Sequence, residues 1–294
     1  MASILDLVGN TPLVEITKVI SKPGITVYGK LEGTNPGGSV KDRAAYGMIK
    51  GALDRGEIKP GVRLIEATSG NTGIALAMIA RVFGLDITLL MPDNSTLERV
   101  QTMRAYGAEV ILTPAEKGGI EYSRELADEM VAKGGYFMLN QFANPDNWGM
   151  HYRTTGPEIW RDTQGKVTHF VSSMGTTGTI MGVSRYLKEQ NPTVQIVGVQ
   201  PTDGSSIPGI RRWSPEFLPK IFEESRVDQK IDVSEEEATI MMKKLAQEDA
   251  IFAGMSSGGA VMAAKKLSET IDEGVIVCII CDRGDRYLSS GIFE

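Results

Sequence analysis

Cysteine and histidine are scarce in this sequence. The 294 residues include two of each, namely Cys278, Cys281, His151 and His169. The cysteines lie in a β-branched run, 275–281, in which residues three apart point to opposite faces of a strand, whereas a redox C-x-x-C pair normally begins a helix. We therefore expect no disulfide, no metal site and no histidine-based catalysis, and we expect a structural role for His169.

Long apolar runs and clusters of basic residues are also missing. No run approaches the length of a membrane-spanning helix, and residues 1–6 lack the basic and apolar regions of a secretory signal. The 31 basic and 37 acidic residues leave the chain mildly acidic, without a lysine or arginine run of the kind that follows a phosphate backbone. We expect a cytoplasmic protein that binds neither nucleic acid nor a membrane.

Short apolar runs alternate with amphipathic segments through most of the chain. This pattern is typical of an α/β fold with parallel sheets covered by helices, and the length favours two domains with a cleft. Residues 201–224, rich in proline, should form a long irregular connection, which is uncommon without a function. Strands are expected at 25–32, 62–67, 86–91, 108–113, 136–140, 167–173, 194–200 and 275–281. Helices are expected at 39–55, 71–83, 96–106, 119–133, 147–163, 178–190, 235–248 and 257–269.

Lys41 lies just inside the N-terminus of an expected helix, a position that is unfavourable for a positively charged side chain. Ser39 can cap this helix, and Asp42, three residues later, completes the pattern of a capping box. Lys41 then lies at the positive end of the helix dipole, which lowers the pKa of its ammonium group and favours the neutral amine of a nucleophile. The alternative is an exposed lysine beside a helix cap.

Two loops that follow expected strands carry small polar residues in unusual density. Residues 68–73 (Thr-Ser-Gly-Asn-Thr-Gly) open a helix whose N-terminus can bind an anion such as a carboxylate. An ordinary capped turn accounts for only one or two of them, so we interpret the segment as a binding loop. Residues 175–179 (Gly-Thr-Thr-Gly-Thr) open another helix and form a pattern that can hold a phosphate.

The second loop excludes two common phosphate ligands. It does not end in the Gly-Lys-Ser/Thr of a Walker A loop, and it lacks the G-x-G-x-x-G of dinucleotide-binding folds. The ligand that it implies is a phosphorylated cofactor rather than ATP or NAD. Two further loops, 254–259 and 282–287, precede a helix or follow the last expected strand, and neither would be unusual alone.

A nucleophilic lysine, a phosphate-binding loop and a carboxylate-binding loop together suggest pyridoxal phosphate bound to Lys41 as a Schiff base. Together with six segments spread along the chain, these features make the sequence resemble the O-acetylserine sulfhydrylase, or cysteine synthase, family of fold-type-II pyridoxal-phosphate enzymes. The resemblance is strongest to the B type of this family. One departure is Gly37, where many B-type sequences would have alanine. The segments that carry the family resemblance are 9–13, 35–43, 66–73, 154–158, 175–179 and 254–259, and those typical of the B type are 175–179, 208–213 and 281–287.

The resemblance implies a fold like that of the tryptophan synthase β subunit, with two parallel-type twisted sheets flanked by helices. A smaller domain would comprise residues 36–146, and a larger domain that binds pyridoxal phosphate would comprise 1–35 and 147–294. Lys41 would bind the cofactor and later carry the α-proton. Other cofactor contacts would be Asn71 at the ring oxygen, Gly175, Thr176, Thr177, Gly178 and Thr179 at the phosphate, and Ser256 at the pyridine nitrogen. The substrate would contact Thr68, Ser69, Gly70, Thr72, Gln141 and Arg211.

The reaction implied by the resemblance is a β-replacement, in which O-acetyl-L-serine loses acetate and sulfide adds to give L-cysteine. B-type relatives also accept thiosulfate, giving S-sulfocysteine, and we expect Arg211, with Arg212 as a second candidate, to favour such a dianion. The alternative is that both arginines only coat the surface. The resemblance also implies a homodimer, and it leaves open whether serine acetyltransferase binds.

Three other functions stay open on the sequence alone. A serine or threonine dehydratase would use the same lysine and phosphate loop, and cystathionine β-synthase is another relative. A non-catalytic binding protein could keep the fold, although the intact Lys41 argues against it.

Overall fold

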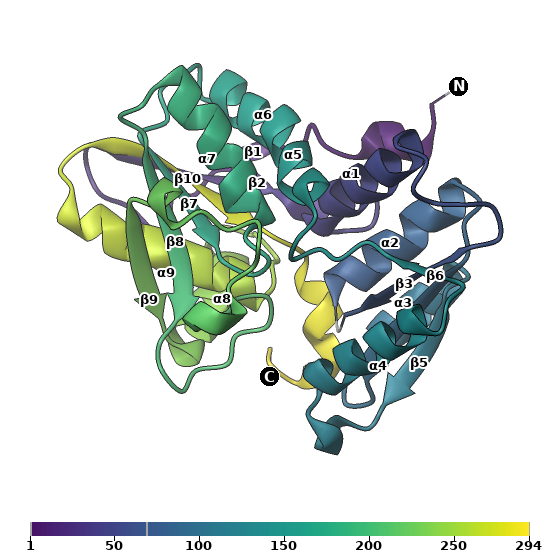
Figure 1. Cartoon of the computed structure of the whole chain (residues 1–294). Helices are drawn as coiled ribbons and strands as arrows, with labels where there is room; N and C mark the ends of the chain where they lie inside the picture. The colour runs from purple at the N-terminus through teal and green to yellow at the C-terminus, as the bar shows by residue number, and fades with distance from the viewer. Residues whose placement is uncertain (1, 69, 294) are drawn as a thin grey trace.

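Two β-sheets flanked by helices make up the computed structural model, which describes residues 2–68 and 70–293 (Figure 1). The six-stranded sheet has the order β1-β2-β10-β7-β8-β9 and the four-stranded sheet the order β5-β4-β3-β6. The strands are β1 (Leu13–Glu15), β2 (Ile25–Leu31), β3 (Arg63–Ala67), β4 (Ile87–Pro92), β5 (Glu109–Thr113), β6 (Tyr136–Met138), β7 (His169–Ser173), β8 (Gln195–Pro201), β9 (Gln229–Val233) and β10 (Gly274–Ile280). The α-helices are α1 (Lys41–Asp54), α2 (Asn71–Val82), α3 (Leu97–Ala105), α4 (Ile120–Ala132), α5 (Pro145–Arg153), α6 (Thr155–Asp162), α7 (Gly178–Gln190), α8 (Glu235–Glu248) and α9 (Met255–Thr270).

The four-stranded sheet is parallel throughout and has apolar residues on both faces. Because successive side chains of a strand point to opposite faces, Leu64 packs with α1 and α2, whereas Ile65 and Ala67 pack with Ala127 of α4. All six residues of β4 are buried. Helices therefore cover both faces, which is the arrangement that an all-parallel sheet requires.

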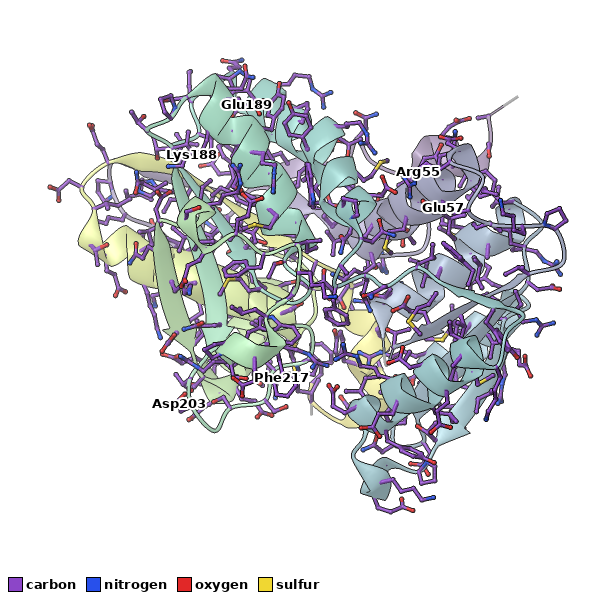
Figure 2. The ribbon with its side chains drawn as sticks, viewed as in Figure 1. Arg55, Glu57, Lys188, Glu189, Asp203 and Phe217 are labelled. Atoms are coloured by element: carbon purple, nitrogen blue, oxygen red, sulfur yellow. The ribbon has the colours of Figure 1, made fainter. Side chains whose placement is uncertain are left out.

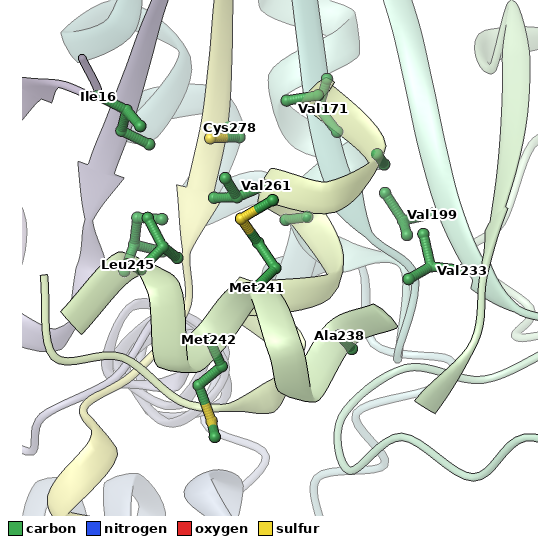
Figure 3. Packing of buried hydrophobic residues seen from close by; sticks show 14 of the residues in the cluster. Ile16, Val171, Val199, Val233, Ala238, Met241, Met242, Leu245, Val261 and Cys278 are labelled. Atoms are coloured by element: carbon green, nitrogen blue, oxygen red, sulfur yellow. The ribbon is translucent and has the colours of Figure 1, made fainter. Parts of the chain in front are cut away.

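The six-stranded sheet is covered by α8 and α9 on one face and by α5, α6 and α7 on the other (Figure 1). Figure 3 shows Met241 of α8 and Val261 of α9 packed with Val171 and Val199 of the sheet. Polar side chains such as Glu189 lie on the outer side of the layers (Figure 2). The carboxyl ends of the parallel strands face the smaller sheet, so the loops that follow them meet between the two sheets.

The α/β fold with two flanked sheets is confirmed, with three differences in detail. The sequence analysis missed β1, which has only three residues and pairs antiparallel with β2, and β9, a largely polar edge strand. It also predicted one helix over 147–163, but the backbone of Thr154 leaves the helical region (φ −127°, ψ −67°) and separates α5 from α6. Each miss reflects a short or polar element that lacks a clear apolar period.

The irregular connection between β8 and β9 is confirmed. Residues 202–228 contain only bends, turns and two three-residue 3-10 turns, Pro215–Phe217 and Glu224–Arg226. Asp203 and Phe217 lie on this connection near its outer surface, where the Phe217 side chain is 69% exposed (Figure 2).

Cys278 lies on β10, and Cys281 directly follows this strand. Cys278 and Cys281 are both free thiols, and the described residues contain no cluster of three metal-binding side chains. Burial, and next the charge of Asp282, raise the pKa of Cys281 to about 12, so its thiol is neutral near pH 7. Across residues 2–68 and 70–293, no helix combines the length and the apolar character needed to cross a bilayer.

Candidate active site

The predicted site residues meet in two adjoining cavities between the sheets. The larger cavity, of about 170 Å³, and the smaller one share Lys41, Asn71, Gly175, Thr176 and Ser256. The larger cavity is also lined by Thr68, Gly70, Thr72, Gln141 and Arg211, and the smaller one by Thr177, Gly178 and Thr179. Ser69 lies outside the described residues. The structure thus brings together the other predicted site residues, apart from Arg212, the second candidate beside Arg211.

Lys41 is the first residue of α1, and its backbone N–H donates to Ser39 Oγ at 3.2 Å. The predicted capping box is wrong, because Asp42 accepts a hydrogen bond of 2.5 Å from Gly37 N instead of turning back to Ser39. The pKa of Lys41 lies below its ordinary value because burial disfavours the ammonium, and the nearby carboxylate of Asp282 opposes this shift only in part. A lowered pKa increases the fraction of neutral amine near pH 7.

The carboxylate-binding loop leads directly into the N-terminus of α2. Thr72 Oγ1 donates to Gln141 Oε1 at 2.9 Å, which joins this loop to the segment that follows β6. Thr68 and Thr72 are buried, with 6% and 5% of their surfaces exposed. Free backbone N–H groups and hydroxyls at this helix end can hold a carboxylate.

The phosphate-binding loop has the backbone that its sequence indicates. Thr177 lies in the left-handed region (φ +70°) immediately before α7, so the loop turns sharply at the N-terminus of this helix, where Thr177 and Gly178 line the smaller cavity. Thr177 Oγ1 is buried and has no hydrogen-bond partner among the described residues. A Cβ atom on Gly178 would lie 2.0 Å from Asn147 Oδ1, so only glycine is accommodated. An unpartnered buried hydroxyl beside helix N–H groups fits a bound phosphate.

Asn147 and His151 of α5 support this loop, and the sequence analysis selected neither. Asn147 Nδ2 donates to Thr176 Oγ1 at 3.1 Å, and His151 Nε2 lies 3.3 Å from Thr179 Oγ1. Burial, and next the charge of Arg43, lower the pKa of His151 to about 3, so the imidazole is neutral. The hydrophobic pattern of the sequence does not identify these two residues. They belong to α5, whereas the loop that they contact precedes α7.

Asn71 is held by the segment that follows β10. Its Nδ2 donates to Asp282 Oδ2 at 2.7 Å, and its Oδ1 accepts from Arg286, which also donates to Gly37 O. Tyr287 Oη donates to the same Asp282 oxygen at 2.7 Å. The position of residues 282–287 after a parallel strand was a signal for a functional loop, but the sequence did not indicate its partner.

A buried ion cluster anchors the first turn of α1. Arg43 donates to Glu32 Oε2 at 2.7 Å and to Glu158 Oε1 at 2.7 Å, and the side chains of Arg43 and Glu32 are fully buried. Lys30 Nζ, also fully buried, lies 2.8 Å from Glu158 Oε2. The cluster therefore ties α1, two residues beyond Lys41, to β2 and α6.

Ser256 and Arg211 complete the wall of the larger cavity, but Arg212 does not reach it. Ser256 is buried at the start of α9, and its backbone oxygen accepts from Ser173 Oγ at 2.8 Å. Arg211 Nη1 lies 3.4 Å from Glu121 Oε1 of α4. Arg212 instead pairs with Asp232 at 2.6 Å, on the outer side of the irregular connection.

Comparisons with known proteins agree with this geometry. The family model described as "Pyridoxal-phosphate dependent enzyme" matches residues 4–282. The chain is 60% identical to cysteine synthase B of Pseudomonas aeruginosa over 292 residues, which cover 99% of this chain and 97% of the relative. It is 57% identical to cysteine synthase B of Escherichia coli over 293 residues, covering 100% and 96%. The crystal structure of a cysteine synthase from Entamoeba histolytica matches with a TM-score of 0.93 at 38% identity, covering 100% of this chain and 90% of that one.

The fold, the phosphate-binding loop and the family match define a pyridoxal-phosphate-dependent enzyme of the transferase type. Within that class the chain belongs to the cysteine synthase family, and its sequence is similar over the full length to the B type.

Proposed function

We propose that the protein converts O-acetyl-L-serine and sulfide to L-cysteine and acetate by β-replacement. The observation that carries this proposal is the meeting of three groups in one cavity: Lys41, the loop that contains Thr68 and Thr72, and the loop that begins at Gly175. The names of the relatives, cysteine synthase and cysteine synthase B, support the same reaction.

The substrate carboxylate would lie at the N-terminus of α2. The Thr68 hydroxyl and the α2 backbone N–H groups, among them that of Thr72, would hold it. Gln141 would donate its amide N–H, since its Oε1 already accepts the hydroxyl hydrogen of Thr72. Ser69 and Gly70, which belong to the same loop, are proposed as further contacts. This placement directs the substrate's α-carbon toward Lys41.

Lys41 would take the α-proton from the bound substrate and hold it on Nζ. The lowered pKa of this amine favours the neutral form that can act as a base near pH 7. The cofactor, when bound, supplies an electron sink for the α-carbon. Ser256 at the pyridine nitrogen would keep that nitrogen less protonated than an aspartate would, which suits elimination of acetate over transamination.

The remaining cofactor contacts are proposed from the cavity walls. Thr176, Thr177 and Thr179, together with the backbone of Gly175 and Gly178, would hold the phosphate, and Asn71 would contact the ring oxygen. These groups would hold the cofactor in the cavity that Lys41 also lines.

Thiosulfate is the finer part of the proposal, with Arg211 as the residue that favours this dianion. Arg211 lines the larger cavity and its contact with Glu121, at 3.4 Å, is long enough to exchange for an anion. Arg212 is a weaker candidate because it pairs with Asp232. Arg211→Ala should lower kcat/KM for thiosulfate about tenfold more than for sulfide, and equal losses for the two donors would contradict the role.

The domain organisation also stays a proposal. Residues 36–146, which contain the four-stranded sheet, would move against 1–35 and 147–294 when substrate binds. The homodimer likewise stays a prediction from the resemblance, and the cytoplasmic location stays a prediction from the sequence. Whether serine acetyltransferase binds stays open.

The experiment that tests the function is a product assay with a visible absorbance spectrum. Purified protein with bound cofactor should change its visible absorbance on addition of O-acetyl-L-serine, recover it on addition of sulfide, and release L-cysteine. Lys41→Ala should bind the cofactor without covalent attachment and release no product. Release of pyruvate from serine, without cysteine, would indicate a dehydratase, and a protein that ignores amino acids would indicate a binding protein.

A further inference from the structure

Glu66 is a buried carboxylate that the proposed reaction does not use. It lies near the end of β3, two residues before Thr68, and only 4% of its surface is exposed. Burial raises its pKa to about 7, against hydrogen bonds from the backbone of Asn140 and Gln141 and the charge of Arg124. A carboxylate at this depth needs partners that compensate for lost water.

The partners of Glu66 lie in the turn that follows β6, the strand beside β3. Asn140 N donates to Glu66 Oε2 at 3.1 Å. Asn140 itself lies in the left-handed region (φ +53°), and its carbonyl oxygen accepts from the N–H groups of Ala143 and Asn144, both at 3.0 Å. The left-handed backbone of a residue other than glycine needs such support, because it is a minor conformation of the free chain.

The same turn carries Gln141, which is held from three sides. Glu66 accepts from the N–H of the preceding residue, Asn140. Asn147 Nδ2 donates to Gln141 O at 2.8 Å, and Thr72 Oγ1 donates to Gln141 Oε1 at 2.9 Å. Because the Gln141 oxygen is occupied by Thr72, its Nε2–H groups are the ones left for the cavity. Asn147 continues the chain of contacts to Thr176 of the phosphate-binding loop.

We propose that Glu66 is a positioning residue for the substrate carboxylate: it fixes the Asn140–Gln141 turn so that the Gln141 amide faces the cavity beside Thr72. This inference rests on the function proposed above, which gives Gln141 its ligand. Glu66 is not among the residues that line the two cavities, so it would act through the backbone of the turn. In the alternative, purely structural role, Glu66 would only stabilise the packing of β3 beside β6 and would not affect substrate binding.

Glu66→Gln and Glu66→Asp separate the two roles. Glutamine keeps the shape and one acceptor but removes the charge, and aspartate keeps the charge but withdraws it from the turn. We expect the Kd for O-acetyl-L-serine, followed by the visible absorbance of the holoenzyme, to rise roughly tenfold in Glu66→Gln. The cofactor content and the KM for sulfide should stay unchanged, and Glu66→Asp should lie between the wild type and Glu66→Gln.

Thr88→Val is a matched control in the same sheet. Thr88 is fully buried on β4, and its Oγ1 donates to Glu109 Oε2 at 2.7 Å, far from the turn in sequence and without contact to Gln141. It should lower the melting temperature without changing the Kd for O-acetyl-L-serine. The proposal is overturned if Glu66→Gln leaves this Kd within twofold, or if Thr88→Val raises it as much at equal loss of stability.

Two further measurements keep the inference testable. If the Glu66 variants do not fold, hydrogen exchange of the wild type decides: Asn140 N–H should exchange at least a hundredfold more slowly than a free peptide, and exchange at the free rate overturns the proposal. If the wild type ignores O-acetyl-L-serine, the proposed function fails, and the same Kd comparison is made with L-cysteine, which carries the same α-amino carboxylate. An unchanged Kd for L-cysteine in Glu66→Gln would overturn the positioning role in that case.

Discussion

Asn71 and Asp282 are 211 positions apart in the sequence and are joined by a hydrogen bond of 2.7 Å from Nδ2 to Oδ2. Because Arg286 donates to the other end of the same amide, the orientation of the Asn71 side chain is fixed before any ligand arrives. One Nδ2–H remains free, and it can donate to a ring oxygen of the cofactor.

Asp282→Ala should therefore weaken cofactor binding. The Asn71 amide loses the acceptor that orients it, and Tyr287 Oη loses its partner at the same time. We expect the Kd for pyridoxal phosphate to rise about tenfold, measured by titrating the cofactor-free protein. Asp285→Ala is the control, because Asp285 pairs with Arg283 at the surface, and an equal effect of both variants would contradict the role of Asp282.

Gly178→Ala should disrupt the phosphate-binding loop. The added Cβ would lie 2.0 Å from Asn147 Oδ1, so Asn147 must move away from Thr176. We expect at least a tenfold rise in the Kd for pyridoxal phosphate, followed by absorbance. The double variant with Asn147→Ala removes the clash, and it should bind the cofactor more tightly than Gly178→Ala alone.

Glu158→Ala should destabilise the fold and remove part of its acid sensitivity. Burial alone would raise the pKa of Glu158. The hydrogen bonds and charges of Arg43 and Lys30 outweigh this effect and lower the pKa to about 2. Its contribution to stability is therefore complete above about pH 4.5 and is lost as the pH falls toward 2. Removing it leaves Arg43 and Lys30 buried, so we expect a loss of about 3–5 kcal/mol in urea unfolding at pH 7. The exposed Lys50–Asp54 pair is the control, and Asp54→Ala should change stability little.

Asp42→Asn should have the opposite pH signature. Burial raises the pKa of Asp42 to about 7, so the folded state binds a proton that the unfolded state releases near pH 4. Above pH 7 the folded wild type must hold Asp42 ionised in a buried position, which lowers its stability. At pH 4 Asp42 is protonated in the folded state, and this loss of stability is absent. The variant should melt several degrees higher than the wild type at pH 8, and this difference should shrink toward zero at pH 4. A difference that stays constant with pH would show that Asp42 acts through its hydrogen bond to Gly37 alone.

Most of the fold could be predicted because its long elements carry strong patterns. The run that became β4 is apolar except for Thr88, and α2 is mostly apolar between two glycine-containing loops, so both were placed within two residues. β1 and β9 were missed because three residues, or a polar edge strand, carry little periodic signal. Their pairing is decided by neighbours that are distant in the sequence.

The cavity-lining residues could be selected in part because each follows a strand of a parallel sheet. Lys41 and the loop at Gly175 carry their chemistry in consecutive residues, and the structure brings both to one cavity. Asn147, Asp282 and Glu66 act through one or two side-chain hydrogen bonds each, and no local sequence pattern predicts such contacts. The sequence also suggested a capping role for Asp42 that tertiary contact with Gly37 overrides.

The strand order of the larger sheet has a consequence for synthesis of the chain. Among the described strands, β10 is the last to be translated. It lies between β2 and β7 and pairs with both. A nascent chain that still lacks residues 274–280 has two edges where the finished protein has a centre, and it also lacks Asp282 and Arg286. The four-stranded sheet, made from residues 63–138, has no such gap and can fold while the ribosome is still translating. The cofactor site therefore matures only after Asp282 and Arg286 have been made, and pyridoxal phosphate can be loaded from then on.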